Sequence, residues 1–456
     1  MSETKRVHFI AVGGSVMHNL ALALHNKGFK VTGSDDEFFE PSKSRLAKAG
    51  ILPDAVGWHA DRITPDLDAV ILGMHAMNDN PELQRARELG IKVYSFPEYL
   101  YEQTRHERRI IVGGSHGKTT TTSMIMHVLR ACNVDFDYMV GALLEGFETM
   151  VKLTAEAKIA VFEGDEYLSS TLDPTPKFHH YHPDIALVTG IAWDHINVFP
   201  TWENYISQFA KFAEKIEPNG KFIYYEGDPE LRKIAQSVRT DVEALPYNGL
   251  DFRTEGETTI VRYNGKDYPT GVFGRHNMQN MHGAMLACRQ VGIEPEQFLT
   301  AMATFHGAAK RLQTLVQKGN SIAFLDFAHS PSKLKATTEA VRERFAGKRL
   351  IACMELHTFS SLTKAFLPQY RDSMKAADEA LVYFNPEVIE HKRLEPITVA
   401  DVASGFGRND LQVFTDSTKL VEKLHTFDYS NTVLLIMTSG NFSGVDIKQL
   451  ANSLIC

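Results

Sequence analysis

The residues best suited to chemistry lie within residues 109–122, where an apolar segment runs into a glycine-rich turn and then into Gly-Lys-Thr. Glycines allow backbone N–H groups to close around phosphate oxygens, and the helix that follows adds unpaired N–H groups and the positive end of its dipole. Lys118 is then placed to reach terminal phosphates and the Thr119 hydroxyl to ligate Mg²⁺. The predicted phosphate-binding loop comprises Gly114, Ser115, His116, Gly117, Lys118, Thr119 and Thr120.

This loop is a shortened variant of the long phosphate-loop motif, because Val112 stands where the first glycine is usual. The alternative is a glycine-rich turn that precedes a helix and binds nothing. The order of apolar strand, glycine turn, Gly-Lys-Thr and helix favours the phosphate-binding hypothesis.

Two later apolar segments end in polar residues that suit a nucleotide site. Residues 158–162 lead into Glu163, and residues 184–191 lead towards His195. If both strands lie parallel to the strand before the loop, their carboxyl ends share one edge of the sheet with Lys118 and Thr119. A carboxylate there can hold Mg²⁺ directly or through water. We therefore expect Glu163 and His195 to share a cation beside Lys118; the alternative for His195 is a hydrogen bond to a backbone carbonyl.

A pair of asparagines precedes a segment that is expected to be helical over residues 281–290. Asn277 and Asn280 are three positions apart, so their amides can face one ligand from the first turn of that helix. For Asn277, capping of the helix is the alternative.

A second glycine turn lies near the N-terminus. An apolar strand precedes Gly13, Gly14 and Ser15, and a helix is expected over residues 19–27. A second strand, residues 30–34, ends at Asp35. An acidic residue about 20 positions after a glycine turn is the ribose-binding arrangement of a Rossmann-like unit. We expect a small parallel sheet that binds one nucleotide diphosphate; an α/β domain without a ligand is the alternative.

The elements that must position these residues alternate between strands and helices along the whole chain, and 456 residues suggest roughly three domains. Residues 221–274 are β-rich and contain an Asn264-Gly265 hairpin turn. Five apolar runs separated by helical stretches follow and indicate another doubly wound sheet: residues 321–325, 349–354, 379–384, 411–414 and 431–437. The predicted fold class is α/β with a Rossmann-like domain (1–106), a central P-loop ATPase-like parallel sheet with a β-rich portion (107–312) and a Rossmann-like C-terminal domain (313–456).

The net charge of −8 argues against broad binding to nucleic acid, so an anionic ligand must be held by local groups. No apolar run approaches the length of a membrane span, and residues 1–6 are too polar to open a signal peptide. We expect a cytoplasmic protein with small-molecule partners, either a monomer or a weak homodimer.

The order of motifs along the chain resembles the Mur ligases. The resemblance rests on the glycine turn at 13–15, Gly-Ser-His-Gly-Lys-Thr-Thr-Thr (114–121), Glu-Gly-Asp-Glu (163–166), Asp-His (194–195), His-Asn-Met-Gln-Asn (276–280), Lys-Arg-Leu (310–312) and Asp-Phe-Ala-His-Ser-Pro (326–331). Mur ligases are three-domain, ATP-dependent, amide-forming enzymes of bacterial cell-wall synthesis. Their N-terminal domain binds a UDP-sugar, the central domain binds ATP, and the C-terminal domain delivers the amine.

The resemblance implies roles for individual residues. As the catalytic set it implies Lys118, Glu163, His195 and Arg311. Thr119, Glu163 and His195 would hold Mg²⁺, Asn280 would face the adenine of ATP, and Arg311 with Asp326 would complete the nucleotide site. Gly14, Ser15 and Asp35 would bind the UDP moiety. As further substrate-binding residues it implies His75, His329 and His357.

Within the family the chain is most similar to the two ligases whose acceptor is UDP-N-acetylmuramate. One adds L-alanine in peptidoglycan synthesis, and the other adds the recycled tripeptide L-Ala-γ-D-Glu-meso-diaminopimelate. Four segments resemble the recycling enzyme: residues 76–81, 165–167, 177–183 and 440–444. The chain departs from both enzymes at residues 355–359, and it has Ser330 where histidine is usual. The implied reaction is tripeptide ligation through an acyl phosphate; the alternatives are ligation of L-alanine and a non-catalytic ATP-binding regulator.

Overall fold

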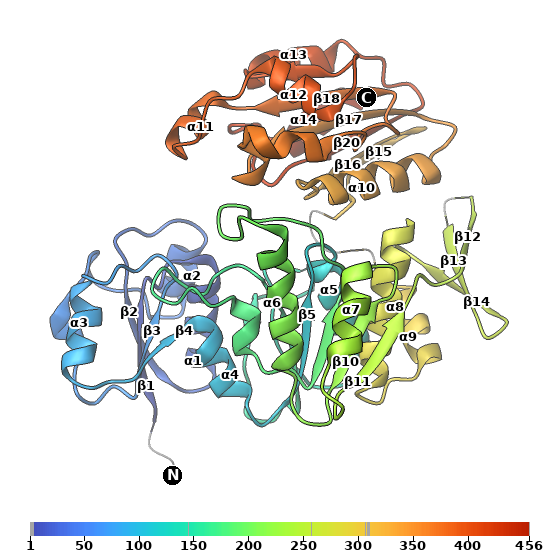
Figure 1. The fold of residues 1–456 in the computed structure, drawn as a ribbon. Coiled ribbons are helices and arrows are strands. Elements are labelled where there is room, and N and C mark those ends of the chain that lie inside the picture. The colour runs from blue at the N-terminus through green and yellow to red at the C-terminus, as the bar shows by residue number, and fades with distance from the viewer. Residues whose placement is uncertain (1–3, 145, 257, 306, 308–310, 456) are drawn as a thin grey trace.

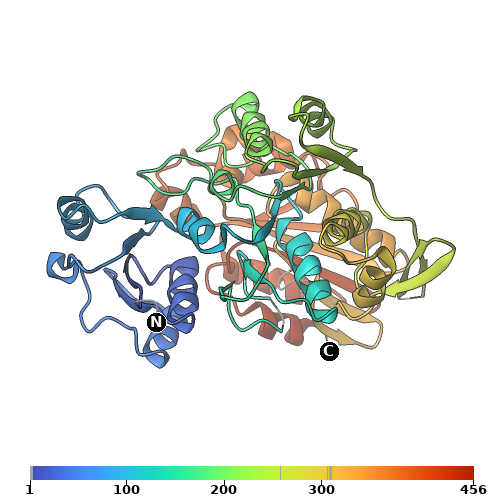
Figure 2. The same cartoon turned by 90° about the horizontal axis from the view of Figure 1, so that it is seen from below.

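The chain folds into three successive α/β units, each built on a largely parallel sheet (Figure 1). The computed structural model describes residues 4–455 except 145, 257, 306 and 308–310. The N-terminal and central units lie side by side, and the C-terminal unit lies above them in Figure 1. Seen from below, the C-terminal unit lies behind the central unit, and the N-terminal unit stands to the left (Figure 2). Within the described residues, no helix combines the length and apolarity needed to cross a bilayer.

The N-terminal unit has a four-stranded parallel sheet, which confirms the small parallel sheet predicted there. Its strand order is β2 (Lys30–Ser34), β1 (Arg6–Ile10), β3 (Ala69–Leu72), β4 (Val93–Ser95). Its helices are α1 (Ser15–Asn26), α2 (Ser42–Lys48), α3 (Pro81–Glu88) and α4 (Phe96–Thr104). Helix α1 begins four residues before the predicted start at residue 19, because its buried apolar face extends back to Met17.

The central unit has a seven-stranded sheet that is parallel except for its edge strand β7. The strand order is β11 (Glu243–Tyr247), β10 (Lys221–Tyr225), β9 (Ile185–Val188), β5 (Arg108–Gly113), β8 (Ile159–Glu163), β6 (Asp137–Met139), β7 (Val151–Lys152). Its helices are α5 (Lys118–Ala131), α6 (Trp202–Glu214), α7 (Pro229–Ser237), α8 (Arg275–Arg289) and α9 (Pro295–Met302). Strand β5 lies between β8 and β9, parallel to both, so the predicted gathering of three carboxyl ends at one edge is confirmed.

The β-rich portion contains a separate antiparallel sheet of β12 (Phe252–Glu255), β13 (Thr258–Tyr263) and β14 (Lys266–Thr270). The predicted Asn264-Gly265 turn joins β13 to β14, with both residues at positive φ. Helix α8 begins at Arg275, six residues before its predicted start, because Met278 already packs into the core beside Met281. Gly274 is the N-cap of this helix, so the capping alternative for Asn277 was wrong.

The C-terminal sheet has the order β15 (Gln313–Lys318), β16 (Ser321–Asp326), β20 (Thr432–Met437), β17 (Arg349–Leu356), β18 (Glu379–Phe384), β19 (Gln412–Phe414). Its helices are α10 (Pro331–Arg344), α11 (Pro386–His391), α12 (Val399–Phe406), α13 (Ser417–His425) and α14 (Ile447–Leu454). The five predicted strands pair in parallel, and successive residues of β17 enter two core clusters on opposite faces, as a doubly wound sheet requires. The antiparallel edge strand β15 was not predicted, because its mostly exposed residues carry no apolar pattern.

The junction between the N-terminal and central units is held by a buried arginine. Arg109 Nε donates to the carbonyl oxygens of Tyr181 and His182, at 3.1 and 2.9 Å. Its Nη1 donates to the carbonyl of Thr104 at the end of α4, and its Nη2 lies 3.2 Å from Asp184 Oδ2. One guanidinium therefore ties the last helix of the first unit to the sheet of the second.

A buried carboxyl pair lies at the same junction. Burial and the neighbouring Asp137 carboxyl raise the pKa of Glu107 to about 8. Glu107 therefore holds a proton in the folded chain at pH values where the unfolded chain, with an ordinary pKa of 4.5, has lost it. The folded state is therefore most stable, relative to the unfolded state, below pH 4.5, where both states hold the proton. This stability falls as the pH rises from 4.5 through about 8.

We expect Glu107→Gln, which cannot ionise, to remove this pH dependence. The two proteins should have similar apparent Tm values near about pH 4.5, the wild type should fall progressively below the variant as the pH rises to about 8, and the difference should reach about 2–4 °C near about pH 8.5. Differential scanning calorimetry across this range measures the difference. The control is Glu102→Gln, which removes a partly exposed carboxylate of α4. A constant offset between Glu107→Gln and wild type at every pH would contradict the prediction.

Candidate active site

The predicted phosphate-binding loop is a tight turn between β5 and α5, anchored to the end of β9. The N–H of Ser115 donates to the carbonyl of Gly190 at 2.9 Å, and the Thr189 hydroxyl donates to the carbonyls of Gly113 and His116. Gly117 is the N-cap of α5, at φ +77°, so the unpaired N–H groups of the helix open into the loop. The local geometry is that of an anion-binding turn.

Gly117 has no room for a side chain. A Cβ at this position would lie 2.4 Å from Asn280 Oδ1, and the positive φ is strained for any L side chain. We expect Gly117→Ala to displace the asparagine, twist the loop and weaken ATP binding by about tenfold or more. Isothermal calorimetry with ATP measures the loss.

Gly50→Ala is the matched control, because Gly50 has a similar φ of +71° and no atom within 4 Å of an added Cβ. It should carry the strain of a left-handed alanine without changing ATP affinity. Equal affinity of Gly117→Ala and Gly50→Ala for ATP would contradict the prediction.

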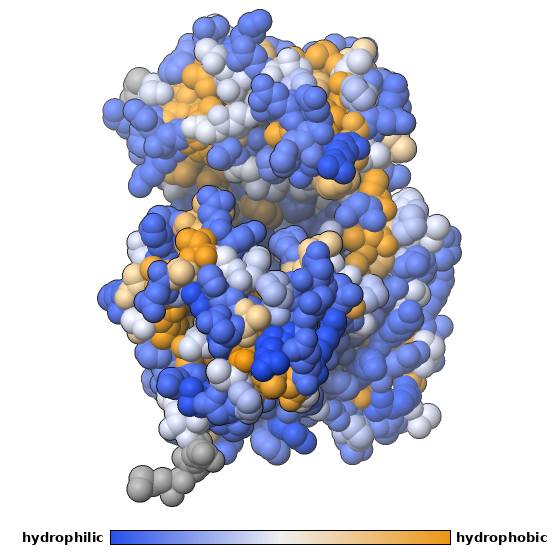
Figure 3. Space-filling view, turned by 90° about the vertical axis from the view of Figure 1, so that its left-hand side faces the viewer, coloured by the Kyte–Doolittle hydropathy of each residue, from blue (hydrophilic) through white to orange (hydrophobic). Residues whose placement is uncertain are grey.

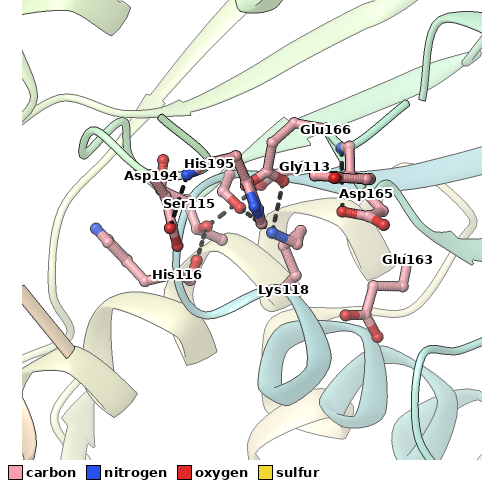
Figure 4. Close-up of polar contacts among 12 residues, drawn as sticks. Gly113, Ser115, His116, Lys118, Glu163, Asp165, Glu166, Asp194 and His195 are labelled. Carbon is pink, nitrogen blue, oxygen red and sulfur yellow. Dashed lines mark hydrogen bonds and ion pairs between the residues drawn. The ribbon is translucent and has the colours of Figure 1, made fainter. Parts of the chain in front are cut away.

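Lys118 is held inside the loop by a buried ion pair (Figure 4). Its ammonium donates to the carbonyl of Gly114 and to Glu166 Oε2, both at 2.6 Å. Burial opposes charge on Glu166, but the Lys118 ammonium and His195 hold the pKa of this carboxyl well below its usual range. The same pairing raises the pKa of Lys118 despite burial. Both groups are therefore charged at neutral pH, and the ammonium is fixed where a phosphate-loop lysine must lie.

His195 also faces Glu166. Its Nε2 lies 3.5 Å from Glu166 Oε1, and the same oxygen accepts a 3.1 Å hydrogen bond from the Tyr205 hydroxyl of α6. Burial alone would lower the pKa of His195, but Glu166 and Asp194 raise it. Figure 4 shows Lys118, Glu166 and His195 converging on one point.

Glu163 lies on the other side of Lys118 in Figure 4. Its Oε1 accepts a 2.9 Å hydrogen bond from the Thr119 hydroxyl, and its Oε2 accepts one from the N–H of Gly141 at 3.0 Å. The structure therefore joins Glu163 to Thr119 and joins His195 to Glu166. The two residues that were expected to share a cation have different partners, because Glu166, three residues beyond the strand end, turns back towards the loop.

The segment that links the central and C-terminal units brings Arg311 to the loop. Its Nη2 lies 3.5 Å from Thr119 Oγ1. The Asp326 carboxylate at the end of β16 accepts the N–H groups of Leu312 and Ala328 at 2.7 and 2.8 Å. Asp326 therefore fixes the backbone beside Arg311, and it also lines the cavity that the loop faces. Lys310, the neighbouring basic residue of the motif, lies outside the described residues.

A cavity of about 400 Å³ lies between the phosphate loop and the first helix of the C-terminal unit. This volume is typical of small-molecule sites. The loop, Glu163, Glu166 and His195 line one side of it, and His329 and Lys333 line the other. A space-filling view shows a recess between the C-terminal unit and the units below it (Figure 3).

Both predicted asparagines line this cavity. Asn280 Nδ2 donates to Asn277 Oδ1 at 3.4 Å, and Asn277 Nδ2 donates to the carbonyl of Phe273 at 2.9 Å. The amide of Asn280 therefore lies against the loop glycine Gly117. The amide nitrogen of Asn277 already donates a hydrogen bond to a backbone carbonyl.

The residues predicted to bind the UDP moiety meet in the turn after β1. Gly14 is the N-cap of α1, and Ser15 is its first residue. Asp35 Oδ2 accepts the N–H of Gly13 at 2.6 Å, and burial raises the pKa of this carboxyl to about 6. The turn after β1 and the carboxylate that follows β2 therefore lie together at the carboxyl end of the N-terminal sheet.

His75 and His357 lie apart from the cavity. His75 is exposed in the loop after β3, and the carbonyls on either side of it accept hydrogen bonds from Thr171 of the central unit. His357 follows β17, with its Nδ1 3.8 Å from Glu355 Oε1. Among the predicted substrate-binding histidines that the structure describes, only His329 lines the cavity beside the loop.

Sequence reasoning missed three residues of the site: Glu166, Tyr205 and Lys333. Glu166 had a visible signal, since it is the last residue of the Glu-Gly-Asp-Glu motif. Tyr205 lies in a buried helix face and Lys333 in a lysine-rich helix, so neither residue had a local signal.

The residues around Lys118 suit Mg²⁺. Thr119, Glu163 and Glu166 offer oxygen ligands, and His195 offers an imidazole nitrogen. In nucleotide sites Mg²⁺ commonly takes one or two carboxylates and completes its shell with phosphate oxygens and water. No three His, Cys, Asp or Glu side chains within the described parts of the chain are arranged to hold a metal by themselves. This donor set fits an ion that is shared with a bound phosphate.

Comparisons with known proteins identify the family of the chain. The Mur ligase family catalytic domain matches residues 6–108, and the Mur ligase middle domain matches residues 112–288. The UDP-N-acetylmuramate–L-alanine ligase of Streptococcus gordonii is 30% identical over 451 residues, covering 96% of this chain and 95% of that protein.

Two solved structures are also similar. The UDP-N-acetylmuramate:L-alanyl-γ-D-glutamyl-meso-diaminopimelate ligase of Neisseria meningitides is 25% identical, with a TM-score of 0.59 over 66% of this chain and 98% of that one. The UDP-N-acetylmuramate–alanine ligase of Thermotoga maritima is 20% identical, with a TM-score of 0.70 over 99% of this chain and 98% of that one.

Proposed function

The chain belongs to the Mur ligase family of ATP-dependent amide-forming ligases, and we propose that it joins UDP-N-acetylmuramate to L-Ala-γ-D-Glu-meso-diaminopimelate. The product would be UDP-N-acetylmuramoyl tripeptide, formed with release of ADP and phosphate. The observation that carries the ATP-dependent step is the convergence of Lys118, Glu166 and His195 on the phosphate loop, opposite a wall supplied by the C-terminal unit.

In the first step a lactyl carboxylate oxygen of the muramate attacks the γ-phosphorus of ATP, and the bond to the β-phosphate oxygen breaks. The products are an acyl phosphate and ADP. Positioning and charge neutralisation dominate such a transfer, so no protein nucleophile is needed. Lys118 and Arg311 would stabilise the charge on the transferred group. Mg²⁺ would be held, together with phosphate oxygens, by one of two pairs, Thr119 with Glu163 or Glu166 with His195, and it would neutralise phosphate charge when bound.

In the second step the donor amine attacks the acyl carbon, and phosphate leaves after a tetrahedral intermediate. A neutral base near this point would assist removal of the amine proton. Burial and Lys333 lower the pKa of His329 to about 3, so this imidazole is neutral at physiological pH. Its place on the cavity wall suits it to accept a hydrogen bond from the amine, whereas the proton itself leaves with the departing phosphate or to water, because a pKa of about 3 makes this imidazole a weak base.

We retain the division of the chain at residues 106 and 312 as part of this proposal. Gly14, Ser15 and Asp35 would hold the UDP-sugar, together with His75 from the loop after β3, where the N-terminal unit contacts the central unit. The C-terminal unit, including His357, would hold the donor. Residues 107–312 would bind ATP through the loop, Asn277 and Asn280.

Two observations favour different donors. The resemblance of residues 177–183 and 440–444 to the recycling enzyme, together with the similarity to the Neisseria structure, favours the tripeptide. The curated relatives at 28–30% identity are named L-alanine ligases, which favours L-alanine as the alternative donor.

A donor panel tests the proposal. The protein is supplied with UDP-N-acetylmuramate, MgATP and either the tripeptide, L-alanine or D-glutamate, and phosphate release and product mass are measured. Fast turnover with the tripeptide and slow turnover with L-alanine is the expected result. The opposite ratio would establish the alternative. If no donor supports ADP formation, a non-catalytic ATP-binding regulator would remain.

A further inference from the structure

Lys333 is a partly buried cation that the proposed mechanism does not use. It lies in the first turn of α10, and its side chain is 23% exposed. Ser332, Lys333, Ala336 and Thr337 all line the cavity, which is the spacing of one helix face. The ammonium therefore points from the C-terminal unit towards the phosphate loop.

The contacts of Lys333 leave most of its hydrogen-bonding capacity unused. Its Nζ lies 3.9 Å from Asp194 Oδ2, which is within ion-pair range but beyond hydrogen-bond distance. Asp194 Oδ1 already accepts the N–H of His195 at 2.8 Å. Within the described part of the chain no acceptor lies within hydrogen-bond distance of this ammonium, which has three N–H donors.

Several cations converge on the same cavity. Lys118 approaches it from the loop, Arg311 from the linking segment, and Lys333 from the opposite wall. Burial lowers the pKa of Lys333. Asp194 and Glu166 oppose this shift, and the nearby Lys118 ammonium and Arg311 guanidinium add to it. Like charges around one space repel, and an anion placed between them removes that repulsion.

We propose that Lys333 is a further catalytic residue, which binds the oxygens of the γ-phosphoryl group from the C-terminal side during transfer. This inference rests on the proposed function, because it requires the phosphate loop to bind ATP. Lys118 would bind the γ-phosphoryl group from the phosphate loop. Lys333 would neutralise the charge on the phosphoryl oxygens that face the C-terminal unit. The ammonium keeps its proton throughout, so no additional proton transfer is introduced into the reaction.

The position of Lys333 links phosphoryl transfer to the position of the C-terminal unit. Lys333 belongs to α10, which directly follows β16 of the C-terminal sheet. The phosphoryl group would therefore be fully neutralised only when the C-terminal unit is stacked on the central unit as in Figure 1. Because the same unit would carry the donor, acyl phosphate formation would be favoured when the donor-binding unit is in place.

The test compares Lys333→Met, which keeps the apolar stem of the side chain, with Lys333→Arg, which keeps the charge. The control is Lys335→Met on the same helix, because Lys335 is 58% exposed and lies 4.0 Å from Glu339. Calorimetry measures the affinity for MgADP and for a non-hydrolysable MgATP analogue, and steady-state assays measure kcat with saturating substrates.

We expect Lys333→Met to bind MgADP as the wild type does, to bind the ATP analogue about 10- to 100-fold more weakly, and to lose about 10²-fold in kcat. Lys333→Arg should recover part of both losses, and Lys335→Met should match the wild type.

Three outcomes would overturn the inference. The first is unchanged analogue affinity and kcat in Lys333→Met. The second is an equal loss of ADP and analogue affinity, which a purely structural pairing with Asp194 would produce. The third is failure of both Lys333→Met and Lys333→Gln to fold. Failure of the wild type to bind either nucleotide would instead contradict the proposed function itself.

Discussion

Replacing Lys118 by alanine is expected to slow ADP release by about 10³–10⁵-fold, the range seen when a cation that neutralises a transferred phosphoryl group is removed. The reason is geometric as well as electrostatic. The ammonium is fixed at 2.6 Å from both Gly114 O and Glu166 Oε2, so it neutralises charge inside the loop without having to reorganise. A coupled assay for ADP, with UDP-N-acetylmuramate and the preferred donor both saturating, measures the rate.

Removal of Lys118 also leaves Glu166 without its ammonium partner, so folding must be checked. Tyr205 and His195 still contact Glu166, and we expect a lower Tm but a folded protein. Lys118→Arg preserves the charge but replaces a compact ammonium by a wide planar group, so it should fold well and remain inactive.

Lys177→Ala is the matched control for Lys118→Ala. This lysine is similarly shielded, with its Nζ 2.6 Å from Asp165 Oδ2, but it does not belong to the cavity wall that the structure describes. Its loss should cost far less activity. Turnover of Lys118→Ala within tenfold of the wild type would remove the phosphate-loop assignment and the proposed function with it.

Glu166→Gln is expected to lower kcat by about 10³-fold. The side chain is fully buried, and its two oxygens contact Lys118, His195 and Tyr205. A neutral amide cannot balance the ammonium or hold Mg²⁺ as a carboxylate does. The titration of kcat against Mg²⁺ concentration should move to higher concentrations, which separates loss of a ligand from loss of folding.

Tyr205→Phe is the structural comparison for Glu166→Gln. It removes the hydroxyl that holds Glu166 Oε1 and leaves the charge in place, so we expect a loss of less than about tenfold. Glu163→Gln tests the alternative carboxylate beside Thr119. If Glu163→Gln shifts the Mg²⁺ dependence and Glu166→Gln does not, the metal ligand is Glu163, and Glu166 only orients Lys118.

Much of the fold was predictable from local patterns. Apolar runs identified β5, β8 and β9, and the glycine turn before Lys118 located the start of α5, because strand periodicity and turn chemistry act over a few residues. The starts of α1 and α8 were predicted too late, since in each helix two polar residues separate the first apolar positions from the rest of the apolar pattern.

Which side chains pair with one another within the site was not predictable from local patterns. A strand end places Glu163 near the loop, and this much follows from the parallel order of β5 and β8. Whether Glu166 points towards Lys118 depends on the irregular turn after β8, whose path is set by contacts with other elements. One of these contacts is the hydrogen bond that Tyr205 of α6 donates to Glu166, 39 residues away in the sequence.

The sequence by itself determined the α/β class, the three successive sheets and the phosphate loop, because each depends on short-range patterns of apolar residues and glycine. Only the tertiary structure decided that His195 pairs with Glu166 and that Lys333 faces the loop. Lys333 and Lys118 are separated by more than two hundred positions and belong to different sheets. Their proximity depends on how two folded units stack, and the free energy of that stacking is spread over many contacts that no local pattern records.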